Sequence, residues 1–178
     1  IRQVIPLSGS PRIRVRVRPL ADWGGRVPDS TWGSNHIRWL LPDFTLRLTG
    51  DVPVRFIRDE SSFVLSHPMN LVLGPDESLT RSVAGFVREA RERTADYWYE
   101  WVRYLSIPLE WQDAVIRSAI TLKLCQYEDS GAIIAAMTTS IPEAPNTSPN
   151  WGYRYCWLRG AAFVGRAVNR SGGTRTMG

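Results

Sequence analysis

An aromatic and cationic segment holds the side chains of this sequence that are best suited to chemistry. Residues 151–159 read Trp-Gly-Tyr-Arg-Tyr-Cys-Trp-Leu-Arg, so four aromatic rings and two guanidinium groups fall within one short run. Aromatic rings stack on the C–H faces of a sugar, while phenol and guanidinium groups hydrogen-bond its hydroxyls. The segment favours a carbohydrate pocket, although an aromatic core cluster at the start of a helix fits this composition about equally well.

Two segments upstream of this run extend the pattern. Residues 122–133 read Leu-Lys-Leu-Cys-Gln-Tyr-Glu-Asp-Ser-Gly-Ala-Ile, and residues 138–143 read Thr-Thr-Ser-Ile-Pro-Glu. Together with residues 151–159 they resemble glycoside hydrolase family 15, and the likeness is strongest over residues 111–159. This family contains glucoamylases, glucodextranase-like enzymes and a trehalase branch. The resemblance implies inverting hydrolysis of α-linked glucosides.

The resemblance also implies substrate-binding roles for three residues of the aromatic segment. Tyr153 matches a tyrosine beside the anomeric carbon, where an electron-rich ring favours an oxocarbenium-like transition state. Trp157 matches a wall of the sugar subsite, and Arg159 matches a guanidinium that binds sugar hydroxyls. A salt bridge at the start of a helix is the alternative for Arg159.

Two glycines depart from the family pattern. Gly152 and Gly160 stand where the family has acidic residues, and the second of those acids grips sugar hydroxyls by the resemblance. A lost charged hydrogen bond costs about 1.5–3 kcal/mol, so we expect impaired sugar binding. Restoring Asp at both positions is expected to raise activity on maltose, maltooligosaccharides or trehalose.

No catalytic residue is assigned in this chain. Inverting hydrolysis needs a general acid and a general base whose carboxyl groups are about 6.5–9.5 Å apart. The family's two glutamates lie downstream of the matching motif, beyond Gly178, so the chain is expected to be a piece of a longer protein and inactive alone. The nearest carboxylates, Glu128, Asp129 and Glu143, are expected to lie in solvent or to cap a helix end.

The first half of the chain has the periodicity of β-strands. Residues 12–18 alternate arginine with Ile or Val, which puts the guanidinium groups on one face of a strand. Further strands are predicted at 36–41, 44–48, 54–57, 63–66 and 70–73. Short strands at this spacing predict an antiparallel β-sandwich, and the resemblance identifies residues 1–77 as part of the β-domain that precedes the family's helical barrel.

The second half is predicted to be helical. Thr94 is a candidate N-cap for an apolar stripe that begins at Tyr97, within a helical linker over residues 78–107. A buried helix is predicted from Pro108, and a second helix over residues 157–170. The resemblance assigns residues 108–178 to the start of an (α/α)6 barrel, whose apolar faces stay exposed unless the rest is supplied. The fold class is therefore α+β and multidomain.

Charge and composition argue against several partners. The net charge is +5 and the pI is about 9.7, but all but one of the 22 basic residues are arginine and are spread along the chain beside carboxylates. No nucleic acid is therefore expected, and the face of residues 12–18 is the one candidate. No metal, cofactor or membrane contact is expected, Cys125 and Cys156 are interpreted as buried thiols, and the cytoplasm is the expected location.

These patterns lead to one functional prediction and two alternatives. The prediction is a glycoside hydrolase of the glucoamylase or trehalase type, with an α-glucoside or α-glucan as substrate and this chain supplying part of one sugar subsite. One alternative is a degenerate, glycan-binding relative marked by Gly152 and Gly160. The other is an inactive fragment. The sequence does not choose between starch ends, dextran and trehalose, and it does not predict the oligomeric state.

Overall fold

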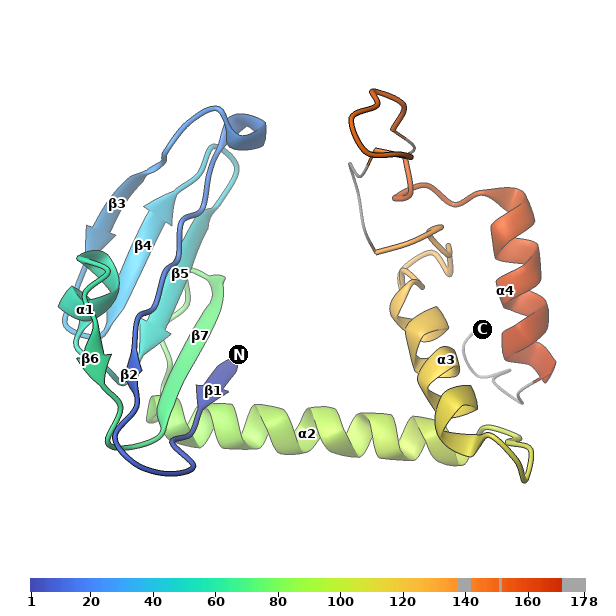
Figure 1. Cartoon of the computed structure of the whole chain (residues 1–178), viewed down its shortest axis with the longest axis horizontal. Helices are drawn as coiled ribbons and strands as arrows, with labels where there is room; N and C mark the ends of the chain where they lie inside the picture. The colour runs from blue at the N-terminus through green and yellow to red at the C-terminus, as the bar shows by residue number, and fades with distance from the viewer. Residues whose placement is uncertain (138–141, 151, 171–178) are drawn as a thin grey trace. The chain divides into compact units, whose positions relative to one another are not determined.

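The computed structural model describes residues 1–137, 142–150 and 152–170. The chain divides into two compact units, a β unit (Ile1–Asp96) and a helical unit (Tyr97–Gly178). Figure 1 shows the strands in the first unit and α3 and α4 in the second. The long helix α2 (Val83–Arg103) contains the boundary between the units.

One five-stranded antiparallel sheet forms the main layer of the β unit. Its strands run in the order β1-β7-β5-β4-β3, which places β1 and β3 at the edges. Their bounds are β1 (Arg2–Val4), β3 (Asp29–Trp32), β4 (His36–Leu40), β5 (Thr45–Gly50) and β7 (Met69–Pro75). In the central pairs Ile37 lies opposite Leu48, and Leu48 lies opposite Leu73, so apolar residues meet on one face of the sheet.

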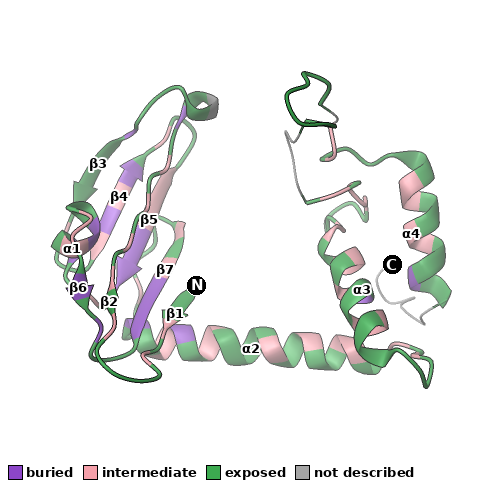
Figure 2. Ribbon diagram, viewed as in Figure 1, coloured by how far each residue is buried: buried purple, intermediate pink, exposed green. Residues whose placement is uncertain are grey.

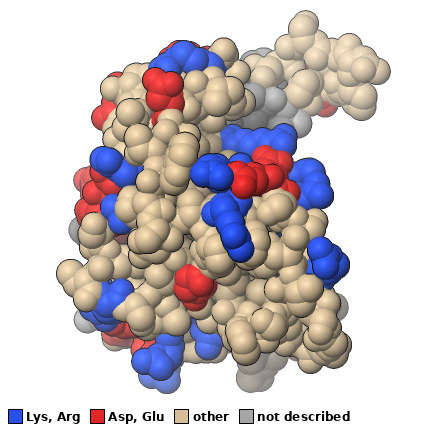
Figure 3. Space-filling model, turned by 90° about the vertical axis from the view of Figure 1, so that its left-hand side faces the viewer, with Lys and Arg blue, Asp and Glu red and all other residues tan. Residues whose placement is uncertain are grey.

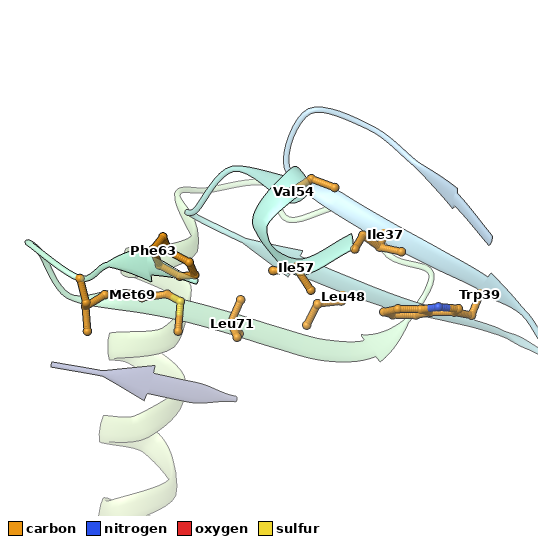
Figure 4. Packing of buried hydrophobic residues seen from close by; sticks show 9 residues of the cluster. Ile37, Trp39, Leu48, Val54, Ile57, Phe63, Met69 and Leu71 are labelled. Carbon is orange, nitrogen blue, oxygen red and sulfur yellow. The ribbon is translucent and has the colours of Figure 1, made fainter. Parts of the chain in front are cut away.

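A second, smaller layer covers that face. It consists of β2 (Arg12–Ile13) paired with β6 (Phe63–Val64), the short helix α1 (Val54–Arg58), and a 3-10 turn η1 (Asp22–Gly24) in the connection to β3. Figure 4 shows the side chains of α1 and β6 pointing toward those of β4, β5 and β7. The buried cluster consists of Ile37, Trp39, Leu48, Val54, Ile57, Phe63, Leu65, Met69 and Leu71.

The structure confirms three of the predicted strands, shortens two and corrects one. Residues 36–41, 44–48 and 70–73 form β4, β5 and β7 with small shifts at their ends, but the strands predicted at 12–18 and 63–66 are formed only at 12–13 and 63–64. The prediction of a strand at 54–57 is wrong, because these residues form α1. Pro53 has φ −53° and precedes the first turn, and Val54 and Ile57 are both buried, a spacing of three that suits a helix.

The start of α2 also differs from the prediction. Thr94 is not an N-cap, because it lies inside α2 and its hydroxyl donates to the carbonyl oxygen of Ala90 at 2.7 Å. The helix begins earlier, where the Ser82 hydroxyl accepts the backbone N–H of Gly85 at 3.2 Å. Val83 and Val87 are buried in the first turns. Thr94 was the predicted N-cap because the apolar stripe begins only at Tyr97, after the charged residues that follow Val87, although α2 lies within the predicted helical linker of residues 78–107.

Two further helices make up most of the helical unit. These are α3 (Gln112–Leu124) and α4 (Leu158–Arg170), the second within one residue of its predicted start. Within this chain α3 is not a buried helix, because Ala119 is its only buried residue and Leu124 is 53% exposed, which agrees with the expectation that its apolar faces stay exposed unless the rest of the barrel is supplied. Too few elements surround α3 to cover its apolar circumference, as the mostly green and pink helices of Figure 2 show. Among the described residues, no helix is long and apolar enough to cross a membrane.

Candidate functional site

The end of α3 begins the scaffold that supports the aromatic segment. The chain turns back on itself after Cys125, so that Ile134 N–H donates to the Cys125 carbonyl at 3.0 Å and Tyr127 N–H donates to the Ala132 carbonyl at 2.8 Å. Gly131 closes this turn at φ +68°, a left-handed conformation that glycine adopts without steric cost. The segment over residues 122–133 is therefore a helix end followed by a tight return.

Ala135 and Ala136 connect the return segment to the aromatic segment through backbone hydrogen bonds. Ala135 N–H donates to the Tyr155 carbonyl at 3.2 Å, and Ala136 N–H donates to the Tyr153 carbonyl at 3.1 Å. These backbone bonds lay the two motifs of the sequence analysis side by side, although about twenty residues separate them in the chain. Of the connecting residues, 138–141 fall outside the part that the structure describes.

The aromatic segment itself is a tight turn before α4. Tyr155 N–H donates to the Gly152 carbonyl at 3.2 Å, and the indole N–H of Trp157 reaches the same carbonyl at 3.4 Å. Tyr153 is half-buried, whereas Tyr155 and Trp157 are exposed, Trp157 at 39%. The rings on this turn are partly open to solvent. Trp151 lies outside the described residues.

The structure connects some of the predicted site residues and not others. Trp157 is tied to Gly152, and Tyr153 is tied through its backbone to Ala136. Arg159 lies exposed in the first turn of α4 and forms no ion pair with any residue that the structure describes. No hydrogen bond joins the Arg159 side chain to Tyr153 or Trp157 in the described part of the chain. These three residues therefore share a turn and a helix start without forming a closed network.

The two glycines differ in the space around them. A Cβ atom on Gly152 would lie 2.5 Å from Cε2 of Tyr155, so a side chain there requires the exposed Tyr155 ring to move. A Cβ atom on Gly160 would meet no atom within 4 Å. A carboxylate at position 160 therefore fits this backbone directly, whereas one at 152 fits only after a local rearrangement.

The carboxylates near the segment are engaged elsewhere or lie in solvent. Glu128 Oε1 is 3.6 Å from Lys123 Nζ and accepts from the Tyr97 hydroxyl at 3.5 Å. Burial and the neighbouring Glu128 charge raise the pKa of Tyr97 above its usual value. Glu143 is exposed, and the chain contains no acidic residue after it. The turn of residues 152–157 thus carries one arginine, Arg154, and no carboxylate.

Lys123 is a residue that the sequence analysis missed. Its side chain is only 11% exposed, and its ammonium group donates to Gln126 Oε1 at 3.1 Å as well as facing Glu128. These contacts join the last turn of α3 to the start of the return segment. The sequence feature that could have drawn attention to Lys123 is that it is the single lysine in an arginine-rich chain.

An apolar cavity of about 240 Å³ lies elsewhere in the helical unit. Its walls come from the end of α2, from α3 and from α4, and they include Trp101, Leu105, Val115, Ala119, Leu122 and Val168. Tyr153, Trp157 and Arg159 do not line it. The cavity is a space between helices and is separate from the aromatic turn.

Thiols and imidazoles are the side chains of this chain best suited to bind a transition metal ion. Among the described residues, no group of three His, Cys, Asp or Glu side chains could hold a metal ion. The interpretation of Cys156 as a buried thiol is wrong, because it is exposed in the turn before α4, and Cys125 is of intermediate exposure. Both thiols are accessible because few residues pack around the end of α3 and the start of α4.

Comparison with known proteins identifies the helical part of this chain. The sequence model described as glycosyl hydrolases family 15 matches residues 110–176. A trehalase from Thermoplasma volcanium is 40% identical over 81 residues, which are 46% of this chain and 13% of that protein. A trehalase from Mycobacterium tuberculosis is 42% identical over 73 residues, which are 40% of this chain and 11% of that protein.

One relative is similar along nearly the whole chain. Trehalase 1 from Sulfolobus acidocaldarius is 29% identical over 176 residues, which are 97% of this chain and 29% of that protein. The chain thus spans less than a third of the length of each of these three relatives. No solved structure matches at a significant level. Residues 110–176 thus match glycosyl hydrolase family 15, and the trehalase relatives support the same family likeness.

Proposed function

We propose that this chain is part of a glycoside hydrolase that cleaves an α-linked glucoside with inversion, and that its aromatic turn forms part of one sugar subsite. The family match over residues 110–176, which includes that turn, is the observation that carries the proposal. The matched relatives named as trehalases make trehalose the first substrate to test, with maltooligosaccharides next.

Solvent access at the turn is compatible with a binding role. Trp157 and Tyr155 are exposed in the helical unit, so a ligand could reach their rings. Trp157 would stack on the sugar, half-buried Tyr153 would face the anomeric carbon, and Arg159 would bind hydroxyls. The absence of an ion pair to Arg159 within the described residues leaves its donors available for that purpose.

The proposed domain arrangement follows the family. Residues 1–77 would be part of a β-sandwich, residues 78–107 a helical linker, and residues 108–178 the start of an (α/α)6 barrel. The exposed apolar side chains of α3 and α4, such as Leu124 and Phe163, support this, because neighbouring barrel helices would cover them. The division into a β unit and a helical unit is compatible with the same plan.

In this proposal, this chain binds the sugar, and the acid and base catalysts come from the remainder of the enzyme. Inverting hydrolysis needs a protonated carboxyl to donate to the leaving oxygen and a carboxylate to activate water. The turn supplies no carboxyl group, so this chain would bind and orient the sugar but would be inactive alone. Gly160 would leave one set of sugar hydroxyls without its acidic partner, which weakens binding.

Sugar binding to the 178-residue chain tests this proposal. Trehalose, maltose and the β-linked control cellobiose are titrated while tryptophan fluorescence and heat are measured. Gly160→Asp is expected to bind the α-glucosides about tenfold more tightly than the unsubstituted chain, because a charged hydrogen bond to a hydroxyl is worth about 1.5–3 kcal/mol. Gly160→Asn, of similar size but without charge, should give a smaller gain.

Arginine variants show whether the turn is the site. Arg159→Ala is expected to weaken binding of trehalose at least about fivefold, because it removes a charged donor. The matched control is Arg166→Ala, which removes an exposed arginine two turns further along α4. Equal effects of the two variants, or equal affinity for cellobiose and trehalose, would contradict the assignment of the subsite.

A further inference from the structure

Lys123 is one of the least exposed cations in the described ion pairs. Its side chain is 11% exposed, whereas that of Arg93 in α2 is 79% exposed. Figure 3 shows the more usual environment on one face of the molecule, where basic side chains lie at the surface beside acidic ones. A cation that is largely withdrawn from water loses hydration, so polar partners must compensate for it. The position of the Lys123 ammonium group is therefore set by the partners that it contacts.

These partners lie in the return segment, residues 126–134. The ammonium group donates to Gln126 Oε1 at 3.1 Å and lies 3.6 Å from Glu128 Oε1. Because the Glu128 side chain is 73% exposed, water screens its ion pair, and the less exposed Gln126 provides the firmer contact. Lys123 also stands in the last turn of α3, where a positive charge interacts favourably with the helix dipole. Its side chain thus ties the end of α3 to the return segment.

The return segment in turn holds the backbone of the aromatic turn. Gln126 pairs through its backbone with Ile133, so the residue that accepts from Lys123 also fixes the returning chain. Two residues after Ile133 a backbone N–H donates to the Tyr155 carbonyl at 3.2 Å, and the following N–H donates to the Tyr153 carbonyl at 3.1 Å. The contacts of Lys123 therefore continue, through backbone hydrogen bonds, to two aromatic residues of the turn.

We propose that Lys123 is a positioning residue of the sugar subsite, which fixes the return segment and through it the backbone of Tyr153 and Tyr155. This inference rests on the proposed function, because it takes the aromatic turn to be part of a subsite. Lys123 acts through Gln126 and the return segment rather than by contact with the sugar. Since a binding group must be held close to its productive geometry, loss of Lys123 would weaken sugar binding while every group that touches the sugar is kept.

Two other roles fit these contacts less well. A lysine that attacks a carbonyl substrate needs a free amine in an open pocket, but the Lys123 ammonium group is engaged by Gln126 and Glu128 and does not line the cavity of the helical unit. A purely structural role would stabilise the helical unit as a whole. Loss of Lys123 would then loosen α4 as much as the bonds between the return segment and the turn, and this difference can be measured.

Amide hydrogen exchange of the 178-residue chain, followed by NMR without sugar, provides that measurement. Lys123→Met keeps a long unbranched side chain but removes the charge and the donor. Exchange at the amides of Ala135 and Ala136 is expected to become at least about tenfold faster, because their bonds to the turn open more often. The amide of Ala161, which donates to the Trp157 carbonyl at 2.9 Å, should change less than about threefold.

A matched variant on the same helix is the control. Arg117→Met makes a similar change at an exposed cation in the middle of α3 and should leave exchange at Ala135 and Ala136 within about twofold of the unsubstituted chain. Calorimetric titration with trehalose then connects the exchange to binding. Lys123→Met is expected to weaken trehalose binding at least about threefold, whereas Arg117→Met should not.

Three results would overturn the proposal. The first is unchanged exchange at Ala135 and Ala136 in Lys123→Met. The second is equal acceleration at these amides and at Ala161, since the role of Lys123 would then be purely structural. The third is selective acceleration with unchanged affinity for trehalose. Failure of the unsubstituted chain to bind any α-glucoside would instead contradict the proposed function, and selective acceleration would then show that Lys123 positions a turn that is not a sugar subsite.

Discussion

The β unit and the helical unit differ in how much of their apolar surface they bury. In the β unit nine side chains from both layers form one buried cluster, whereas in the helical unit Ala119 and Val168 are the only buried apolar residues among those described. Figure 2 shows this contrast, with purple concentrated on β4, β5 and β7. Two opposed layers can bury the space between them, but two helices leave most of their circumference open.

This contrast separates a unit with its own core from one that depends on further contacts. The stability of a domain comes mostly from apolar area removed from water, set against the entropy of ordering the chain. By this reasoning the β unit is the more stable part of the chain. The helical unit, where the aromatic turn lies, would gain most from additional polypeptide.

The largest expected difference is between a buried leucine of the β unit and an exposed leucine of the helical unit. Leu48 in β5 is 3% exposed, so Leu48→Ala is expected to lower the free energy of unfolding by about 2–5 kcal/mol. Leu124→Ala at the end of α3 makes the same change at an exposed site and should cost less than about 1 kcal/mol. Urea unfolding followed by circular dichroism measures both. Similar losses for the two variants would show that α3 is as well packed as the sheet.

A smaller effect is expected from filling the cavity of the helical unit. Ala119 lines the space of about 240 Å³, so Ala119→Leu can place extra methylene groups there and raise the free energy of unfolding by about 1 kcal/mol. Ala162→Leu is the control, because Ala162 is exposed in α4 and does not line the cavity. Urea unfolding followed at 222 nm reports on both variants. A loss of stability in Ala119→Leu alone would mean that the helices pack more closely than described.

The smallest predicted effect is a pH response confined to the β unit, which contains both histidines of the chain. Burial, followed by the charges of Arg47 and Arg38, lowers the pKa of His36 below its usual 6.5. As the pH falls, His36 is therefore protonated at a higher pH in the unfolded chain than in the folded chain. The stabilising contribution is complete above pH 6.5 and is lost as the pH falls from there through the folded pKa.

Substitution of each histidine tests this response. His36→Gln should remove the decline in stability below pH 6.5, whereas His67→Gln, between β6 and β7, should leave it in place. Urea midpoints measured at intervals of pH and an NMR titration of the imidazole protons provide the readouts. A decline of the same size in His36→Gln would mean that other groups cause it.

Much of the fold could be predicted because its signals are local. Runs of strand-forming residues separated by turn residues predicted β4, β5 and β7, and the barrel that the resemblance implies placed a helix over residues 157–170, which the structure shows as α4. The strand predicted at 54–57 was wrong, because four apolar-rich residues fit a strand and a buried helical turn equally well until their neighbours are known. Thr94 was misread because a hydroxyl that caps a helix and one that bonds back within it occur in similar sequences.

The candidate site could be predicted only in part. Its residue types and the likeness to the family indicated a sugar subsite from the motifs alone, and the family model matches residues 110–176, which include that segment. The sequence could not tell that a side chain at Gly152 would press on Tyr155 while Gly160 has open space. It also did not indicate that Lys123 would be nearly buried between Gln126 and Glu128, because those contacts depend on the turn that follows α3.

The amino-acid sequence by itself indicated the family likeness of the helical part and the type of most of the helices and strands, because motifs and periodicity are properties of neighbouring residues. The tertiary structure decided which apolar faces are covered. Residues 12–18 and α3 show the difference, since both have the periodicity of buried elements but lie beside an open groove and an open cavity. Burial depends on contacts between residues distant in sequence, and these are made only when the elements pack.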